Sequence, residues 1–150
     1  MYTGGSDTVT VEYSVKYLPQ DEHYYICGVS QPPIPNPVSV VVPAGSTAFE
    51  VIENAVNQFG SSYKFTATYF YSMGYFINAI NDVPYTITNH PPSRCFWKFI
   101  VQYPNGTEVA PDVGVSTFTF NSDGYGMIMS YQDVCPGHPS REPKKLKEEL

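Results

Sequence analysis

The stretch STAFEVIENAVNQFG, residues 46–60, decides the fold because it is the one segment with a convincing helical pattern. Its apolar residues recur at helical spacing, namely at Ala48, Val51, Ile52, Ala55, Val56 and Phe59. Ser46 or Thr47 is a natural N-cap, and Glu50 completes a capping box with Thr47. Gly60 is a natural stop. The apolar stripe of this helix needs a sheet to cover.

The segments on both sides of the helix have the composition or the period-two alternation of strands. We predict strands over residues 8–18, 38–42, 63–71, 74–80, 95–103, 114–120 and 126–132. Turn-rich or proline-rich segments separate them. The sequence therefore predicts an α+β fold, with a mixed or antiparallel sheet packed on one helix. We expect one domain over residues 1–135 and a flexible charged tail over 136–150.

Composition and missing motifs narrow the function. The net charge of −6 argues against nucleic acid as a partner, since that affinity comes largely from Lys and Arg. No apolar run is long enough to cross a bilayer. His23, His90 and His138 are scattered in expected loops, and Cys135 with His138 lacks a group to orient the histidine. We predict a protein that is not an enzyme and that holds no metal.

Three features favour the secretory pathway, either as a secreted protein or in the lumen of the endoplasmic reticulum. The start of the chain does not read as a signal peptide, so the protein is either cytosolic or present here in its mature form, and the three features favour the mature form. Asn105-Gly106-Thr107 is a glycosylation sequon in an expected turn. The ending KEEL resembles a retrieval signal.

Besides the sequon and the ending, the third feature that favours the secretory pathway is the set of three cysteines, which allow one disulfide and one further thiol. We expect Cys27 to pair with Cys95, which would tie the proline-rich connection to the start of the tryptophan strand. The alternative is Cys95 with Cys135. The leftover cysteine would be a free thiol or a link to another chain.

Four pieces of the sequence, taken in order, resemble one family. They are VVVPAGSTAFEVIENA (40–55), GYFINAIND (74–82), CFWKFIV (95–101) and GVSTFTFNSDGYGMIMSY (114–131). This run, about residues 38–132, is similar to the C-terminal domain of the vitamin B12 carriers transcobalamin and gastric intrinsic factor. The resemblance implies a β-grasp-like mixed sheet of about five to seven strands on one helix.

The resemblance also implies a ligand-binding module, with cobalamin as a candidate ligand and no metal ligand from the protein. By motif position, Ile77 and Phe99 would face the ligand, together with Trp97 and the segment Gly114, Val115 and Ser116. The carriers have a long helical domain that this chain lacks, so another small ligand fits equally well. The alternative function is a protein-interaction or structural module, for which the tyrosine-rich segment 67–76 would provide the surface.

Strand alternation divides the tryptophan strand into two faces. It places Trp97, Phe99 and Val101 on one face and Phe96, Lys98 and Ile100 on the other, wetter one. For Trp97 and Phe99 the competing interpretation is packing under the helix as core.

Overall fold

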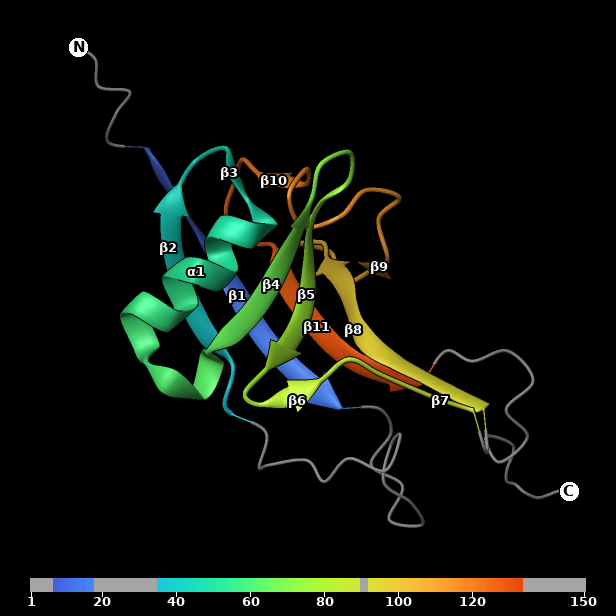
Figure 1. Ribbon diagram of the computed structural model, residues 1–150. Helices are drawn as coiled ribbons and strands as arrows, with labels where there is room; N and C mark the ends of the chain where they lie inside the picture. Colours follow the sequence, from blue (N-terminus) through green and yellow to red (C-terminus); the bar gives the residue numbers. More distant parts are fainter. Residues whose placement is uncertain (1–6, 18–34, 90–91, 134–150) are drawn as a thin grey trace, which may run out of the picture.

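Figure 1 shows the computed structural model, which describes residues 7–17, 35–89 and 92–133. In chain order the elements are β1 (Thr8–Tyr17), β2 (Val38–Pro43), β3 (Ser46–Thr47), α1 (Ala48–Phe59), a 3-10 turn (Ser61–Tyr63), β4 (Phe65–Phe70), β5 (Gly74–Ile80), β6 (Val83–Pro84), β7 (Thr86–Asn89), β8 (Pro92–Gln102), β9 (Glu108–Val109), β10 (Thr119–Phe120) and β11 (Gly126–Asp133). The predicted tail, 136–150, lies outside the described residues.

The main sheet is mixed and has six strands, in the order β2-β1-β11-β8-β7, with β9 also paired to β8. Its centre is a parallel pair, β1 with β11, and every other pair in it is antiparallel. The helix follows β2 in the chain and packs back on β1 and β2. The predicted α+β fold, a mixed sheet on a single helix, is confirmed.

The helix starts as its sequence predicts. Thr47 is the N-cap, the Glu50 N–H donates to Thr47 Oγ1 at 3.2 Å, and the Thr47 N–H donates to the Glu50 carboxylate at 2.8 Å. Gly60 ends the helix with a positive φ of 96°. Phe59 differs from the prediction: it is the last residue of α1 and is exposed, and its ring meets that of Tyr63 at 6.4 Å.

The predicted strand over residues 114–120 is wrong for most of its length, since only Thr119–Phe120 is a strand. A turn precedes it, in which the N–H groups of Thr117 and Phe118 both donate to the carbonyl of Gly114. The turn is used to cap α1: the Ala48 N–H donates to Phe118 O and the Phe49 N–H to Val115 O, each at 2.9 Å. The first N–H groups of a helix have no partner within it, and this turn provides two of the acceptors.

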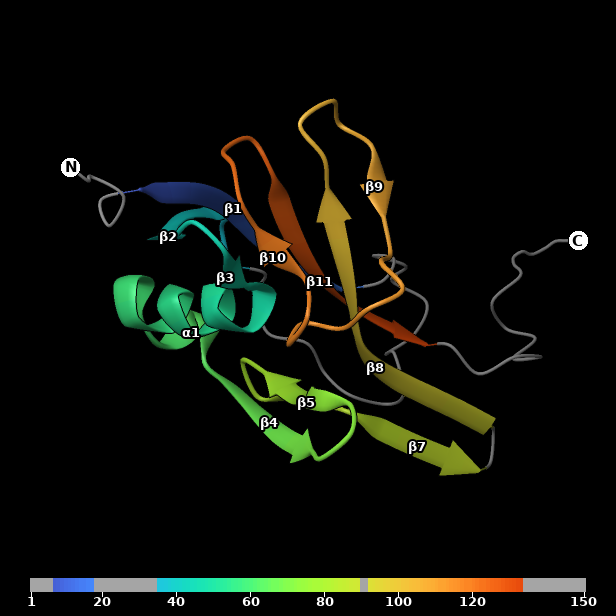
Figure 2. The same cartoon turned by 90° about the horizontal axis from the view of Figure 1, so that it is seen from above.

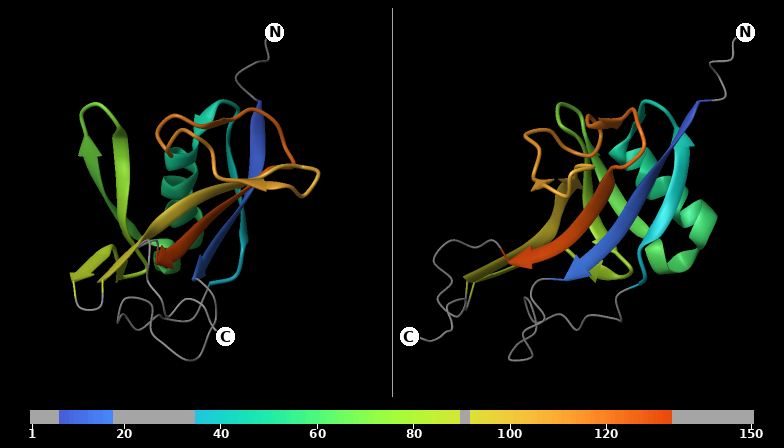
Figure 3. Two further views of the ribbon diagram at one scale, coloured as in Figure 1. Left: turned by 90° about the vertical axis from the view of Figure 1, so that its right-hand side faces the viewer. Right: turned by 180° about the vertical axis from the view of Figure 1, so that it is seen from behind.

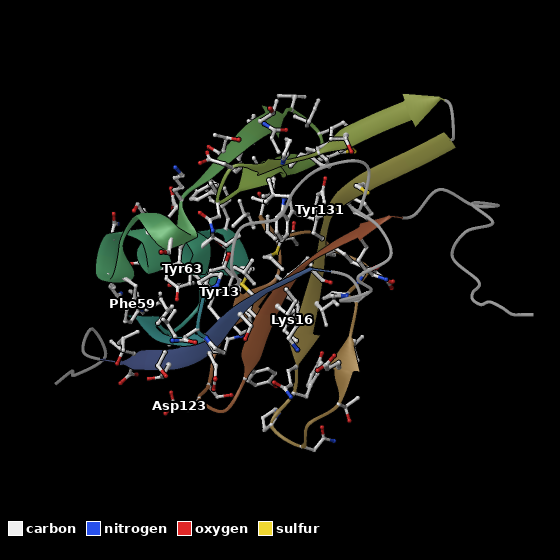
Figure 4. The ribbon with its side chains drawn as sticks, turned by 90° about the horizontal axis from the view of Figure 1, so that it is seen from below. Tyr13, Lys16, Phe59, Tyr63, Asp123 and Tyr131 are labelled. Carbon is white, nitrogen blue, oxygen red and sulfur yellow. The ribbon has the colours of Figure 1, made fainter. Side chains whose placement is uncertain are left out.

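Two elements, lying side by side, cover one face of the main sheet. Figures 1 and 2 show α1 over β1 and β2, and the β4–β5 hairpin beside it toward β8. In the view from behind in Figure 3, no helix or strand of the described residues lies over the other face of the sheet. Side chains of β1 follow this division, with Tyr13 on the helix side and Lys16 on the opposite side in Figure 4.

The two faces of β8 follow the predicted alternation. Trp97 and Val101 are buried, Phe99 beside them is half-buried, and Lys98 on the other face is half-buried. Trp97 is core, but the helix does not cover it. It packs beneath β6, and its ring lies 5.0 Å from that of Tyr131.

The sequence did not predict the short strands β3, β6, β7 and β9. Each is only two or four residues long. β6, β7 and β9 lie in segments interrupted by turn residues and proline, which we had assigned to loops. Because a period needs several repeats to be recognised, strands of this length leave no signal of their own.

The outer edge of β2 is blocked by a side chain of the helix. The Gln58 Nε2 donates to Val41 O at 3.0 Å, and the Val41 N–H donates to Gln58 Oε1 at 3.5 Å. One side-chain amide thus occupies the backbone donor and acceptor that Val41 would otherwise offer to another chain.

Candidate functional site

A pocket of about 330 Å³ lies between β5, the middle of β8 and the segment that follows β9. Most of its lining is apolar. Tyr75, Phe76, Ile77, Phe96, Trp97, Lys98, Phe99, Ala110, Pro111, Asp112, Val113, Gly114, Val115 and Met129 line it. Five of the six residues that the sequence proposed for ligand binding are therefore together in one pocket. Their role in binding stays a prediction.

Ile77 and Phe99 form opposite walls, because β5 belongs to the hairpin layer and β8 to the main sheet. Ile77 is buried, and its strand contacts β8 directly. Phe99 is half-buried, and its ring meets that of Phe118 edge-on at 5.8 Å. Phe99 thus keeps part of its ring available to a ligand, whereas Ile77 offers only a small surface.

Trp97 is a fixed wall of the pocket. Its indole Nε1 donates to Val83 O at 2.9 Å, and the Tyr131 hydroxyl donates to Pro84 O at 2.6 Å. The first bond holds β6 against β8 and the second holds it against β11, and together they satisfy both polar groups. Trp97 is 4% exposed, so it contributes shape more than accessible surface.

The predicted ligand-facing segment, Gly114 to Ser116, forms part of a turn, and its three residues do not share one position. Gly114 and Val115 line the pocket, but Ser116 does not. The Ser116 Oγ instead accepts the Tyr75 N–H at 2.9 Å and lies against Gly74, where an added Cβ would come within 2.7 Å. Ser116 therefore joins the turn to β5, and the earlier assignment of it to the ligand surface lacks support from its contacts.

The sequence missed most of the remaining lining. Tyr75 and Phe76 had been noted only as part of a tyrosine-rich surface, and nothing marked residues 110–113. Lys98 and Asp112 are the two charged residues of the lining, and they have opposite sign.

The other predicted sites are tested less directly. Cys95 is fully buried at the start of the β11-paired part of β8, while Cys27 and Cys135 lie outside the described residues, so the pairing stays a prediction. Asn105 is exposed in the turn after β8, and its Oδ1 accepts the Thr107 N–H at 2.9 Å. His23, His90 and His138 lie outside the described residues as well.

Within residues 7–17, 35–89 and 92–133, no three His, Cys, Asp or Glu side chains are grouped to hold a metal ion. Over the same ranges, no helix is long and apolar enough to cross a membrane. The strongest electrostatic perturbation lies away from the pocket, at Tyr13 on β1. Burial raises the pKa of the Tyr13 phenol well above its usual range, and nearby Tyr63 adds to the shift.

Comparison with known proteins supports the fold and goes no further. No family model matches the chain, and no curated protein matches it. A crystal structure of haptocorrin in complex with Cbi is similar, with a TM-score of 0.60 and 18% identity. The similarity covers 86% of this chain and 26% of haptocorrin, so the chain spans about a quarter of that protein. The resemblance to domains of the vitamin B12 carriers is thus supported at the level of fold.

Proposed function

We propose that this protein is a non-catalytic ligand-binding module whose ligand occupies the pocket between β5, β8 and the turn at residue 114. The observation that carries the proposal is the convergence of five motif residues on one apolar pocket. Apolar pockets with a few placed polar groups are the usual form of small-molecule sites. Asp112 would supply such a group here, since the side chain of Lys98 lies on the other face of β8.

A corrinoid is the first candidate ligand. The haptocorrin structure that resembles this chain contains Cbi, and the sequence motifs point to the same group of carriers. The pocket volume of about 330 Å³ is near the lower limit of small-molecule sites. This pocket would therefore contact only one edge of so large a ligand. Because less of the ligand would be buried, its affinity would be lower than that of a full-length carrier.

Titration with aquocobalamin and with cobinamide, followed by calorimetry and by Trp97 fluorescence, tests the proposal. We expect saturable binding that Phe99→Ala weakens about tenfold, equivalent to about 1.4 kcal/mol. Tyr71→Ala is the matched control, because Tyr71 is an aromatic residue 93% exposed at the hairpin tip and outside the pocket. Absence of heat and of a fluorescence change at high micromolar corrinoid would exclude this ligand class.

The exposed end of the β4–β5 hairpin supports a second function, a protein-interaction module. Its large side chains face solvent at Tyr69, Phe70, Tyr71 and Met73. Aromatic residues and Met are enriched at protein interfaces. A secretory-pathway location, with Asn105 glycosylated, belongs to either function. Self-association measured by light scattering, lost in Tyr71→Ala, would favour the interaction module; a monomer with and without reducing agent would count against it.

A further inference from the structure

The outer edge of β4 is an unpaired sheet edge. In the three-stranded sheet β4-β5-β6, β4 is a terminal strand, and within residues 7–17, 35–89 and 92–133 it pairs only with β5. Figures 2 and 3 show β4 on the outer side of the hairpin, farther from the main sheet than β5. At the edge of β2, by contrast, the Gln58 side chain occupies the donor and the acceptor of Val41. The edge of β4 lacks such protection.

A contact at the start of β4 shows which of its backbone groups point outward. The Asn81 N–H, just after β5, donates to Lys64 O at 2.8 Å, so the Lys64 carbonyl points toward the β5 side. Successive residues of a strand direct their N–H and C=O to opposite sides. The residues that direct their backbone groups to the open edge are therefore Phe65, Ala67 and Tyr69.

A contact at the other end of the strand gives the same result. The Tyr75 N–H donates to Ser116 Oγ at 2.9 Å and therefore not to Tyr69, which lies opposite it. The backbone groups of Tyr69 thus point to the open edge. The ladder has a bulge, but its extra residue is Asn78 on β5, so the alternation along β4 is unbroken. Among the described residues, no hydrogen bond reaches the three outward residues of β4 on this side.

The composition of the hairpin favours a second copy of this chain as the partner at that edge. The strand reads FTATYF, without Pro, Gly or charge, and no charged residue occurs between Lys64 and Asp82. Those two residues pair with each other at 2.8 Å. The chain as a whole carries a net charge of −6, so two copies approach most easily where neither presents charge. An uncharged edge strand is also the kind that natural proteins otherwise block.

The strand is self-complementary about Ala67. When Ala67 lies opposite its own copy in an antiparallel pair, Phe65 lies opposite Tyr69 of the second copy. All three outward residues then exchange hydrogen bonds, whereas the neighbouring registers use only two of them. Ala67 has the smallest side chain of the strand, and it lies on the two-fold axis, where each residue meets itself. The same register pairs aromatic with aromatic residues and Thr66 with Thr68, which are favourable cross-strand pairs.

The edge is accessible and already held in position. Thr66 and Thr68 are exposed, and Tyr69 is 58% exposed. On the inner face of the hairpin, the Phe49 ring stacks on that of Tyr75 at 4.0 Å and meets that of Phe65 edge-on at 5.6 Å. A second copy would therefore meet a strand that needs no further ordering, which favours association.

We propose that β4 pairs antiparallel with β4 of a second copy, which makes the protein a symmetric dimer with one sheet through both hairpins. Because the paired segment is short, the dimer should dissociate on dilution. It does not depend on the ligand proposed for the pocket. It also uses the edge of the hairpin rather than the exposed tip that supports the second function.

Sedimentation velocity of the full chain over a range of concentrations tests the dimer. We expect a monomer–dimer equilibrium that reducing agent leaves unchanged. Ala67→Pro removes the N–H on the axis without removing a bond to β5, so it should weaken the dimer about tenfold or more. Val41→Pro makes the same change at the edge of β2 and is the matched control, which should leave the dimer unchanged. Association through the tip would instead be lost in Tyr71→Ala and kept in Ala67→Pro.

Two double variants test the register. Thr66→Lys with Thr68→Glu places opposite charges across the axis, whereas Thr66→Lys with Thr68→Lys places like charges there. We expect the second pair to dimerise at least about fivefold more weakly than the first. Equal dissociation constants would overturn the register. A dimer that persists in Ala67→Pro, with a natural circular dichroism spectrum, would overturn the edge of β4 as the interface. A natural chain that stays monomeric at hundreds of micromolar would overturn the second copy as the partner.

Discussion

The main sheet has one closed half and one open half. In the closed half, α1 lies over β1 and β2, and Gln58 occupies the free donor and acceptor of Val41 at the edge. In the open half, the hairpin approaches β8 only in part, and a pocket of about 330 Å³ remains beside the part of β8 that neither β7 nor β9 reaches. Both halves are built from alternating strands, so alternation does not decide which half is available for binding. The difference comes from what covers the faces and edges.

The largest effect expected from this difference is in packing. Ile52 is fully buried on the side of α1 that packs on the sheet, so Ile52→Ala should lower the free energy of unfolding by about 2–5 kcal/mol. Phe99→Ala, in the open half, should cost less than Ile52→Ala although it removes more atoms, because Phe99 is only half-buried beside a pocket. Urea unfolding of both variants measures the contrast. Equal losses would mean that the open half is packed as firmly as the closed one.

A weak point inside the closed half should give an effect of opposite sign. Among the described residues, the Tyr13 hydroxyl is fully buried without a hydrogen-bond partner, so Tyr13→Phe should stabilise the protein, by about 1 kcal/mol at neutral pH. The pKa of Tyr13 is raised on folding, so its stability contribution is complete below the unfolded pKa of about 10 and is lost as pH rises above it.

Tyr13→Phe should therefore gain further on the natural protein as pH rises above about 10. Urea unfolding at neutral pH and at alkaline pH measures both effects. Phe is the informative replacement because it keeps the ring, which lies 6.1 Å from that of Tyr63. A loss of stability at neutral pH would reveal a partner for the hydroxyl that the described residues do not provide.

The smallest effect concerns the edges themselves. Gln58→Ala should reduce stability by less than about 1 kcal/mol, because Val41 is exposed and water replaces the lost bonds. Val101 lies opposite Val109, so a longer β9 would bring residue 111 opposite Phe99. Pro111→Ala should allow β9 to extend, which would protect the Phe99 amide from hydrogen exchange. Amide exchange resolved by residue measures both. An unchanged exchange rate at Phe99 in Pro111→Ala would mean that the proline does not determine where β9 ends.

The sequence predicted the closed half better than the open half. The helix, its capping box and the central strands have repeating patterns long enough to recognise, and all of them are present. The order of strands in the sheet is a different matter, because no local pattern reveals that β1 lies parallel to β11. The family resemblance implied a β-grasp-like mixed sheet, but neither it nor the pattern specified the strand order.

The pocket shows the same limit at the level of single residues. Motifs identified Ile77, Phe99, Gly114 and Val115, which lie in elements that a motif can describe. They also included Ser116, whose hydroxyl is used for the contact with Tyr75. Residues 110–113 were missed because their position depends on where β9 leaves β8. That departure is set by a register count between two strands, which sequence alone does not fix.

The turn after Gly114 connects the pocket to the start of α1. Val115 lines the pocket with its side chain, while its carbonyl accepts the Phe49 N–H at the start of α1. The Phe49 ring stacks on Tyr75 at 4.0 Å, and Tyr75 is tied back to Ser116, so the contacts form a closed loop. A ligand that orders Val115 would therefore also order the first turn of α1 through these contacts. A partner bound to the start of α1 would then have a different affinity for the filled and the empty protein.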